Sequence, residues 1–446
     1  MRRAGRIAAL ASVAALGAGL GALGACTDHR APITGTQALQ VTLNAPTDPG
    51  NADNRLPDAA RTVSMTIAAI GADGKVDTTF NATLQVYVQF LGTLTPYFIC
   101  TPGQMNTPST PCGAPLTTIQ MTNGMATLSN FMLPPVFGPT TVWFEDGCYL
   151  DGGSGNSNAC PQTTTYATGS SPTLWYRDPF IQDIRRPADE SSPDAYQVGP
   201  IDNKNVAVAA SRYGANGRLV ITSVYSQGYT LADVNCKGAG GTPPCTASDY
   251  DYIDVFSYSA PLDQEKRFLN EGQIVDGFAG GVSEFDGLLE IGFPQTFFSQ
   301  ATPAVCNPPS ATCNKAYEPQ PDPTSATCMS DPAACTGTTM KMDYSWFTNT
   351  IYFKRNESNA LEVDNAAVCN LDSDYTTFKQ WKLDLSGTGG NCTGNVLNVV
   401  SAGIFDPTPY VGMKLPRVVG IERSINIGTF HVWIIYPRGM NDFTLP

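Results

Sequence analysis

The chain has 446 residues, of which 42% are hydrophobic and 15% are charged, and its formal net charge at pH 7 is −13. The hydrophobic content excludes a disordered chain, and few charges with many Gly and Pro residues are typical of exported all-β proteins. The negative charge argues against nucleic acid as a partner, because an acidic surface repels the phosphate backbone.

The first 25 residues predict a secretory signal peptide. Residues 1–6 are basic, and residues 7–23 form an uncharged run that is too short and too rich in Ala and Gly for a convincing membrane span. The next segment, Leu23-Gly24-Ala25-Cys26, resembles a bacterial lipobox, which implies that Cys26 carries lipid and begins the mature chain. Cleavage near Ala25 without lipidation is the alternative. We expect residues 26–36 to be a tether, and the membrane partner to be the bacterial outer membrane, because Thr27 rather than Asp follows Cys26.

The cysteines support export. Setting Cys26 aside from the 13 cysteines leaves an even number, which favours six disulfides in an oxidising compartment. In chain order the neighbours are Cys100 and Cys112, Cys148 and Cys160, Cys236 and Cys245, Cys306 and Cys313, Cys328 and Cys335, and Cys369 and Cys392. Sequence does not fix the connectivity, although the spacing favours short local staples in loops. No C-x-x-C occurs, so thiolate metal binding is the weaker interpretation.

Residues 37–165 predict a β-sandwich. Apolar residues alternate in 39–43, 61–70, 82–90 and 140–145, which indicates half-buried strands. Asn123-Gly124, within 119–128, predicts a hairpin. The segments Asp73-Gly74, Asn123-Gly-Met-Ala-Thr127 and Gly138-Pro-Thr-Thr-Val-Trp143 resemble bacterial immunoglobulin-like modules, which implies an immunoglobulin-like β-sandwich over about a third of the chain.

Residues 166–194 predict a linker, because much of the segment is polar and Pro-rich. The exception is the aromatic run 174–181, which we expect to dock one domain on the other.

Residues 195–446 predict a second β domain. Alternating segments occur at 205–209, 218–225 and 252–258, followed by 271–275 and 280–291. Glu271-Gly272, Gly280-Gly-Val-Ser-Glu-Phe-Asp-Gly-Leu-Leu-Glu290 and Pro409-Tyr-Val-Gly-Met-Lys-Leu-Pro-Arg-Val-Val419 resemble the OB-fold domain of extracellular bacterial nucleases. The resemblance implies an elaborated OB-like β-barrel. A stretch at about 300–395 interrupts the pattern, and we expect there a disulfide-rich insertion with an aromatic strand at 344–354. Residues 415–427 and 429–436 would close the barrel.

Residue types needed for catalysis are scarce. The two histidines are His29, in the tether, and His431, in a predicted strand, so a Ser-His-Asp hydrolase lacks its base. Nucleases that share the OB-like domain perform catalysis in a separate domain, and nothing in these 446 residues resembles it. We therefore expect neither an enzyme nor a cofactor.

Carboxylates offer an alternative. A hydrolase of surface polymers needs two acids that face each other, and Glu284, Asp286 and Glu290 on one predicted hairpin share strand parity if the pairing is regular. Further candidate acids are Asp254 and Asp276. Solvated edge charges are the simpler interpretation. The residues Asp249, Asp251 and Asp254 lack the spacing of a calcium loop, so we expect no metal.

The aromatic residues give the functional prediction. OB-folds bind single strands by stacking bases on aromatic rings in a basic groove. Candidate ligand-face residues are Tyr225, Tyr229, Tyr252, Phe256 and Tyr258. Residues 180–300 contain 8 Lys and Arg against 16 Asp and Glu, so a glycan, a peptide or an envelope protein is the expected partner, and single-stranded nucleic acid is a second alternative. The competing interpretation is that these rings fill the barrel.

Overall fold

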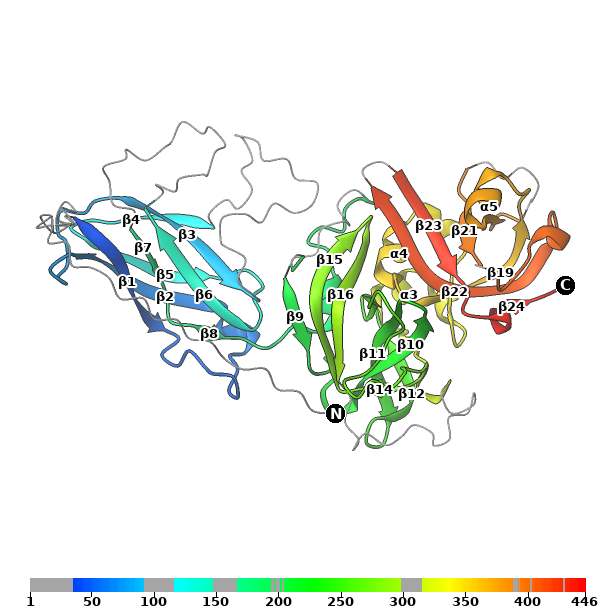
Figure 1. Ribbon diagram of the computed structural model, residues 1–446, viewed down its shortest axis with the longest axis horizontal. Coiled ribbons are helices and arrows are strands. Elements are labelled where there is room, and N and C mark those ends of the chain that lie inside the picture. Colours follow the sequence, from blue (N-terminus) through cyan, green and yellow to red (C-terminus); the bar gives the residue numbers. More distant parts are fainter. Residues whose placement is uncertain are drawn as a thin grey trace, which may run out of the picture.

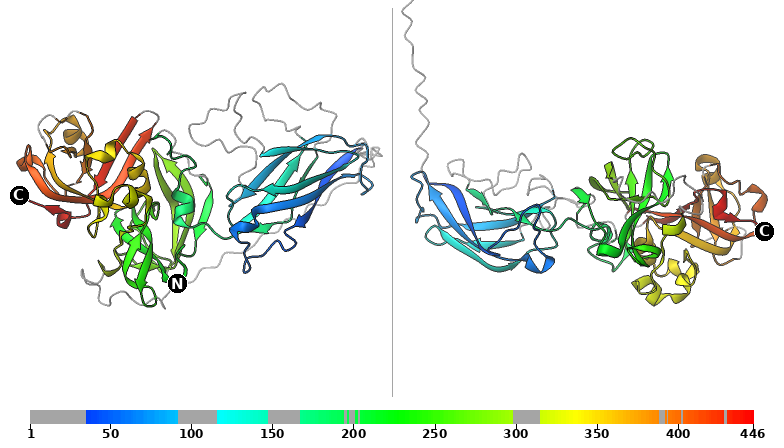
Figure 2. Two further views of the ribbon diagram at one scale, coloured as in Figure 1. Left: turned by 180° about the vertical axis from the view of Figure 1, so that it is seen from behind. Right: turned by 90° about the horizontal axis from the view of Figure 1, so that it is seen from below.

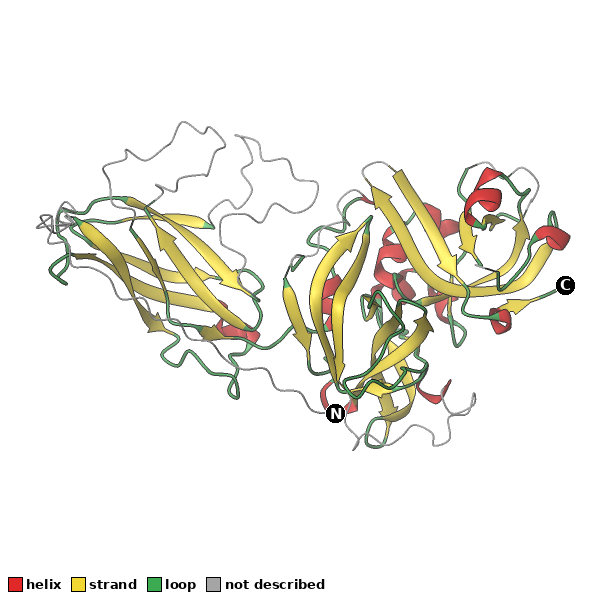
Figure 3. Cartoon of the chain, viewed as in Figure 1, coloured by secondary structure: helices red, strands yellow, loops and turns green. Residues whose placement is uncertain are grey.

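The computed structural model describes residues 35–91, 116–146, 167–193, 196, 201–202, 204–297, 315–387, 392, 394–401, 403–427 and 430–446. The predicted signal peptide, Cys26 and almost all of the predicted tether therefore lie outside the described residues. The described chain consists mostly of β-strands, which confirms the all-β prediction (Figure 3). Its longest α-helices are α4 (Ile351–Asn356) and α5 (Ser373–Phe378), with six residues each.

Two sheets form the N-terminal body (Figure 1). One sheet contains β1 (Thr36–Ala45), β2 (Thr62–Gly71) and β5 (Met125–Met132). The other contains β3 (Thr83–Phe90), β4 (Thr117–Gln120), β6 (Pro139–Glu145), β7 (Thr168–Ser170) and β8 (Leu174–Trp175). Alternate apolar residues of both sheets, such as Ile67 and Phe144, are fully buried in one core, as the period of two predicts.

The Asn-Gly turn forms and Thr122 pairs with Met125 across it, but the predicted hairpin does not extend beyond this pair. Asn123 and Gly124 both have positive φ, 51° and 74°. However, β4 pairs with β3 while β5 pairs with β2, so the turn connects the two sheets. Hydrogen bonds explain the difference, because the Gly124 amide donates to the Phe80 carbonyl and the Gly124 carbonyl accepts from the Ala69 amide.

The next strands pair in a closed cycle that we call the first ring. Its strands are β10 (Gly217–Tyr225), β11 (Gly228–Gly238), β13 (Tyr252–Phe256), β16 (Leu288–Phe297) and β15 (Gly277–Phe285), hydrogen-bonded in that order. The short β14 (Ile274–Val275), just before β15, pairs back with β10 and closes the cycle. Only β13 and β16 run parallel among these neighbours. Flanking strands are β9 (Asn205–Val208), β12 (Thr242–Ala247) and β17 (Gln320–Pro321).

The C-terminal strands form a second ring with the same connectivity. Its strands are β19 (Ala360–Val368), β20 (Gln380–Asp384), β21 (Leu397–Val400), β23 (Phe430–Tyr436) and β22 (Lys414–Ile427), and β22 pairs back with β19. Here β21 and β23 are the parallel pair. Flanking strands are β18 (Met340–Lys341) and β24 (Phe443–Thr444). In both rings the spatial order of the five strands, numbered along the chain, is 1-2-3-5-4.

This arrangement differs from the predicted barrel with an insertion. The expected insertion at about 300–395 supplies β19 and β20, which are members of the second ring. The strands expected to close the first barrel, β22 and β23, pair with β19 and β21 instead. The first ring needs no later strand, because β14 already closes it.

The predicted aromatic strand at 344–354 is wrong. The segment folds into the 3₁₀-helix η6 (Tyr344–Phe347) and into α4. The Asp343 side chain accepts a hydrogen bond from the Ser345 amide and so begins the first turn. Trp346 and Phe353 then pack edge to face with ring centroids 5.4 Å apart, and Phe353 stacks on Trp433 of β23. Burial of these rings requires helical spacing here.

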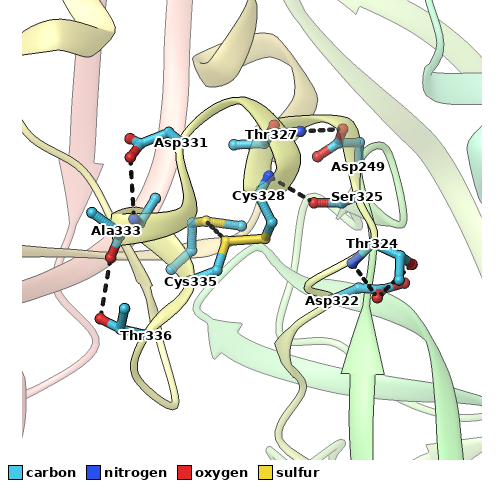
Figure 4. Close-up of a disulfide and its surroundings, with 12 residues drawn as sticks. Asp249, Asp322, Thr324, Ser325, Thr327, Cys328, Asp331, Ala333, Cys335 and Thr336 are labelled. Carbon is cyan, nitrogen blue, oxygen red and sulfur yellow. Dashed lines mark hydrogen bonds between the residues drawn. A yellow bond between two sulfur atoms is a disulfide. The ribbon is translucent and has the colours of Figure 1, made fainter.

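Three of the predicted disulfides are present: Cys236–Cys245, Cys328–Cys335 and Cys369–Cys392. The other candidates, Cys100, Cys112, Cys148, Cys160, Cys306 and Cys313, lie outside the described residues. The Cys328–Cys335 bond joins α3 (Ala326–Ser330) to the 3₁₀-helix η5 (Pro332–Cys335), as Figure 4 shows. The Thr327 amide donates to Asp249 at 3.0 Å, so the stapled segment is tied to the loop before β13.

Buried charges join the two rings, in a group that we call the junction cluster. Its members are Arg185 at the end of α1 (Ile181–Arg185), Glu284 of β15, Lys354 and Glu357 at α4, and Glu422 of β22. Arg185 and Lys354 both pair with Glu357, and the Lys354 ammonium also donates to the Gly287 carbonyl at 3.1 Å. Arg185 belongs to the segment 166–194, which was expected to dock one domain on another.

The N-terminal body contacts the first ring beside β9. The Lys204 ammonium donates to the Phe90 carbonyl at 3.2 Å and lies 4.3 Å from the centre of the Phe90 ring. The body and the two rings follow one another along the long axis of the molecule (Figures 1 and 2).

Candidate binding site on the first ring

The structure divides the five candidate aromatic residues into two groups. Tyr229 and Tyr252 are buried, with exposed fractions of 0% and 2%, and they fill hydrophobic cores rather than face a ligand. Tyr225 is half-buried, and its hydroxyl donates to Asp254 at 2.6 Å. Phe256, the last residue of β13, is also half-buried, and of the five only Tyr258, two residues later, is exposed. The interpretation that the rings fill the barrel is therefore correct for Tyr229 and Tyr252.

A further residue, Phe293, packs with Phe256 and Tyr258. These three residues form what we call the aromatic platform. The Tyr258 and Phe293 rings stack with centroids 4.9 Å apart, and Phe256 meets Tyr258 edge to face at 4.4 Å. The side chains of Tyr258 and Phe293 remain 54% and 80% exposed. Such stacked rings offer a ligand a large apolar face at low conformational cost.

The backbone of the platform is strained. Tyr258 and Phe293 have φ values of 59° and 51°, in the left-handed region that bulky residues rarely adopt. At Phe293 the cause is a bulge, because the register between β15 and β16 shifts between Ala279 and Gly281. Strain of this kind concentrates at functional sites. Phe293 was not among the candidates predicted from the sequence, although Gly292-Phe293-Pro294 interrupts the strand alternation there.

A carboxylate pair lies beside the platform on the same outer face of the first ring. Asp254 of β13 is directly opposite Glu290 of β16 in the parallel register, just as Phe256 is opposite Gly292. Asp254 is fully buried and forms an ion pair with Arg423, which reaches over from the second ring. The Arg423 guanidinium also donates to the Tyr225 hydroxyl at 2.8 Å. The charge of Asp254 is thus matched inside the protein.

Glu290 differs from Asp254 because it has no hydrogen bond or ion pair with any described residue. It is half-buried. Burial, and then the neighbouring charge of Asp254, raise its pKa to about 7, while the Arg423 guanidinium opposes the increase. A carboxyl group with this pKa can donate or accept a hydrogen bond near neutral pH.

The other candidate acids do not join this pair. The turn at Asp286-Gly287 pairs Ser283 with Glu290 and Glu284 with Leu289, so Glu284 and Glu290 point to opposite faces. The expectation that Glu284, Asp286 and Glu290 share a face is therefore corrected. Glu284 belongs to the junction cluster, Asp286 is exposed in the turn, and Asp276 lies between β14 and β15.

The acids Asp249, Asp251 and Asp254 also stay apart. Asp249 accepts from the Thr327 amide, Asp251 pairs with Arg212, and Asp254 pairs with Arg423. Within the described ranges no group of three or more His, Cys, Asp or Glu side chains could hold a metal ion. His431 is the second residue of β23, opposite Asn426 in the register with β22.

No family model, no curated protein and no solved structure matches the chain. Across the parts of the chain that the structure describes, none of the helices has the length and apolar character needed to span a bilayer.

Proposed function

We propose that the chain is a non-catalytic binding lipoprotein, anchored through Cys26 in the outer membrane, which binds a glycan on the aromatic platform. The observation that carries this proposal is the exposed stack of Tyr258 and Phe293 at the surface of a closed ring. The N-terminal body, which we propose to be immunoglobulin-like, would act as the spacer between the anchor and the rings.

The strand order supports an OB-like assignment for both rings. A five-stranded barrel of order 1-2-3-5-4 with a parallel pair of strands 3 and 5 is typical of that architecture, which binds oligonucleotides and oligosaccharides on the face of strands 2 and 3. In the first ring Phe256 lies on strand 3, and the Ser257 amide donates to the Gln227 carbonyl in the loop between strands 1 and 2. This position at one end of strand 3 supports the platform as the ligand-binding surface.

Charge favours a glycan over a single-stranded nucleic acid. Stacking on aromatic rings serves both ligands, but a nucleic acid also needs cations for its phosphates. Arg423, the cation beside the carboxylate pair, is already neutralised by Asp254. A sugar instead offers hydroxyl groups, and these can donate hydrogen bonds to carboxyl oxygens such as those of Glu290.

A glycan array probed with the chain from residue 27 onward tests this proposal, followed by calorimetric titration of the glycans that bind. Replacing Tyr258 and Phe293 by Ala should weaken binding by at least tenfold, because each stacked ring contributes about 1–3 kcal/mol in comparable base-stacking sites. The matched control is Phe378→Ala, which removes an aromatic ring that is 68% exposed on the second ring. Equal affinity of both variants would exclude the platform as the binding site.

The carboxylate pair supports a second candidate function, a carboxylate-dependent hydrolase of surface polymers. Glycosidases use one carboxyl group with a raised pKa as the general acid and a second carboxyl group that stays ionised. Glu290, whose pKa is raised, and the ion-paired Asp254 would match these two roles. Burial of Asp254 and its bonds to Arg423 and Tyr225 favour a structural role instead. Release of reducing ends from a bound glycan, abolished by Glu290→Gln, would establish the hydrolase, and binding without turnover would exclude it.

A further inference from the structure

We propose that Glu290 is the specificity-determining residue of this site, and that it selects neutral sugars over sugars that carry a carboxylate. The inference rests on the proposed glycan function and adds the class of ligand to it.

Position places Glu290 within reach of a sugar on the platform. Phe256 and Glu290 are diagonal neighbours across the parallel pair β13 and β16, a separation of about 7–8 Å between backbones that long side chains bridge. The corner between them is occupied by Gly292, which has no side chain. Apart from its two chain neighbours, the one atom that a Cβ added at Gly292 would meet within 4 Å is the Gly281 carbonyl oxygen, at 3.9 Å.

The opposite edge of this corner adds a second polar group. Gly281 of β15 pairs with Gly292, and Asn205 of β9 pairs with Gly281. The Asn205 amide oxygen lies 3.6 Å from the place where a Gly281 Cβ would be. One row of paired positions across the sheet therefore contains the Phe256 ring, Gly292, Gly281 and the Asn205 amide. Glu290 lies two residues before Gly292 on β16, in the neighbouring row. An aromatic face together with amide and carboxyl groups suits a pyranose ring with free hydroxyls.

The surrounding charges leave that of Glu290 uncompensated. The charged groups that act on its carboxyl are Asp254 on β13 and Arg423 on β22, and its partner on β15 is the neutral Ser283. Asp254 and Arg423 form an ion pair and cancel. An ionised Glu290 therefore adds a full negative charge to the site, which repels a ligand carboxylate at short range.

Protonation of Glu290 sets the pH range of the selection. Because burial and then Asp254 raise its pKa to about 7, the group is mostly neutral at pH 5.5 and mostly ionised at pH 8. The neutral acid donates a hydrogen bond that a ligand carboxylate accepts, whereas the ionised form only accepts. Selection against acidic sugars should accordingly be strong at pH 8 and weak at pH 5.5.

A matched pair of probes isolates the carboxylate: hexagalacturonic acid, which is ionised at both pH values, and its fully methyl-esterified form, which is neutral. We expect the wild-type chain at pH 8 to bind the ester about tenfold more tightly than the acid, a difference of about 1.4 kcal/mol. The ratio should fall to below about threefold at pH 5.5. Glu290→Gln should give the low ratio at both pH values.

The control is Asp286→Asn, which removes an exposed carboxylate from the turn of the same hairpin and should leave the ratio unchanged. A ratio near one in the wild type at pH 8, or a ratio that Glu290→Gln does not lower, overturns this inference and leaves the glycan function standing if Phe293→Ala still abolishes binding. Failure of both probes to bind at millimolar concentration, with no neutral glycan retained on an array, overturns the glycan function itself and this inference with it.

Discussion

At the scale of single residues, we expect Glu284 to make the stability of the molecule depend on pH. Its two carboxylate oxygens are buried without a hydrogen bond, and its nearest cation is the Lys354 ammonium at 3.6 Å. Burial is the main cause that raises its pKa to about 7, Glu357 and Asp202 add to the increase, and Lys354 and Arg185 oppose it. The folded state thus binds a proton that the unfolded chain releases near its ordinary pKa of 4.5.

The free energy of unfolding should therefore fall as pH rises. The contribution of Glu284 is fully present below pH 4.5 and is lost as pH increases through about 7, a total of about 3 kcal/mol from 1.4 kcal/mol per pKa unit. Glu284→Gln should flatten this part of the profile, measured by thermal unfolding between pH 4 and pH 8. The exposed Asp286→Asn is the control, and an unchanged slope in Glu284→Gln would contradict the prediction.

The residues of the site were predictable to different degrees. Residue type marked Phe256, Tyr258 and Glu290 as candidates, but alternation did not separate Phe256 from Tyr252, which has the same strand parity and is buried. Phe293 was not recognisable, because a bulge moves it outward against the alternation. Arg423 was not either, because it lies 169 positions after the aspartate that it pairs with, and periodicity carries no information on such contacts.

At the scale of elements, the Cys328–Cys335 staple should stabilise the segment that includes α3 and η5. Its two cysteines are seven positions apart, and closing so short a loop contributes about 2–3 kcal/mol through the unfolded state. Replacing both cysteines by Ser should lower the thermal midpoint and increase amide exchange in residues 326–335. The Thr327 amide, which donates to Asp249, should then exchange faster as well, because this hydrogen bond depends on the position of α3. Exchange rates equal to those of the wild type would show that the staple is dispensable.

Most strands were predictable from alternation, and the two failures among the elements have physical causes. The Asn-Gly turn specifies its own backbone but not which strand each arm pairs with, and here the arms join different sheets. Residues 344–354 are rich in aromatics, which favour strands on average. Packing of Trp346 and Phe353 on the second ring instead selects helical turns, since tertiary contacts override a weak local preference.

At the scale of the whole molecule, the Arg423–Asp254 ion pair should couple the two rings. Arg423→Met leaves Asp254 as a buried, unpaired charge, and such a loss costs about 3–5 kcal/mol. Adding Asp254→Asn removes the orphaned charge and should restore much of the stability. A double-mutant cycle of unfolding free energies measures this coupling, and purely additive effects would show that the rings do not depend on the pair.

The organisation of the whole chain was only partly predictable. Composition and strand spacing predicted an all-β molecule, and the motifs near Glu271–Glu290 fall on β14, β15 and β16 of the first ring. The cysteine-rich stretch suggested an insertion, because its many prolines and loop residues make the strand pattern of β19 and β20 hard to detect. Which strand closes a ring is decided by pairings such as Ala360 with Ile421, and these leave no local pattern in the sequence.

The position of Arg423 also imposes an order on biosynthesis. All strands of the first ring are complete once Phe297 has been made, yet the guanidinium that neutralises its buried aspartate arrives 169 residues after that aspartate. Since chains are made from the N-terminus, we expect Asp254 to lack its cation until β22 has been made, and the first ring to be less stable until then. A chain truncated before β22 should therefore be cleaved by proteases faster than the full chain, although every strand of its first ring is present.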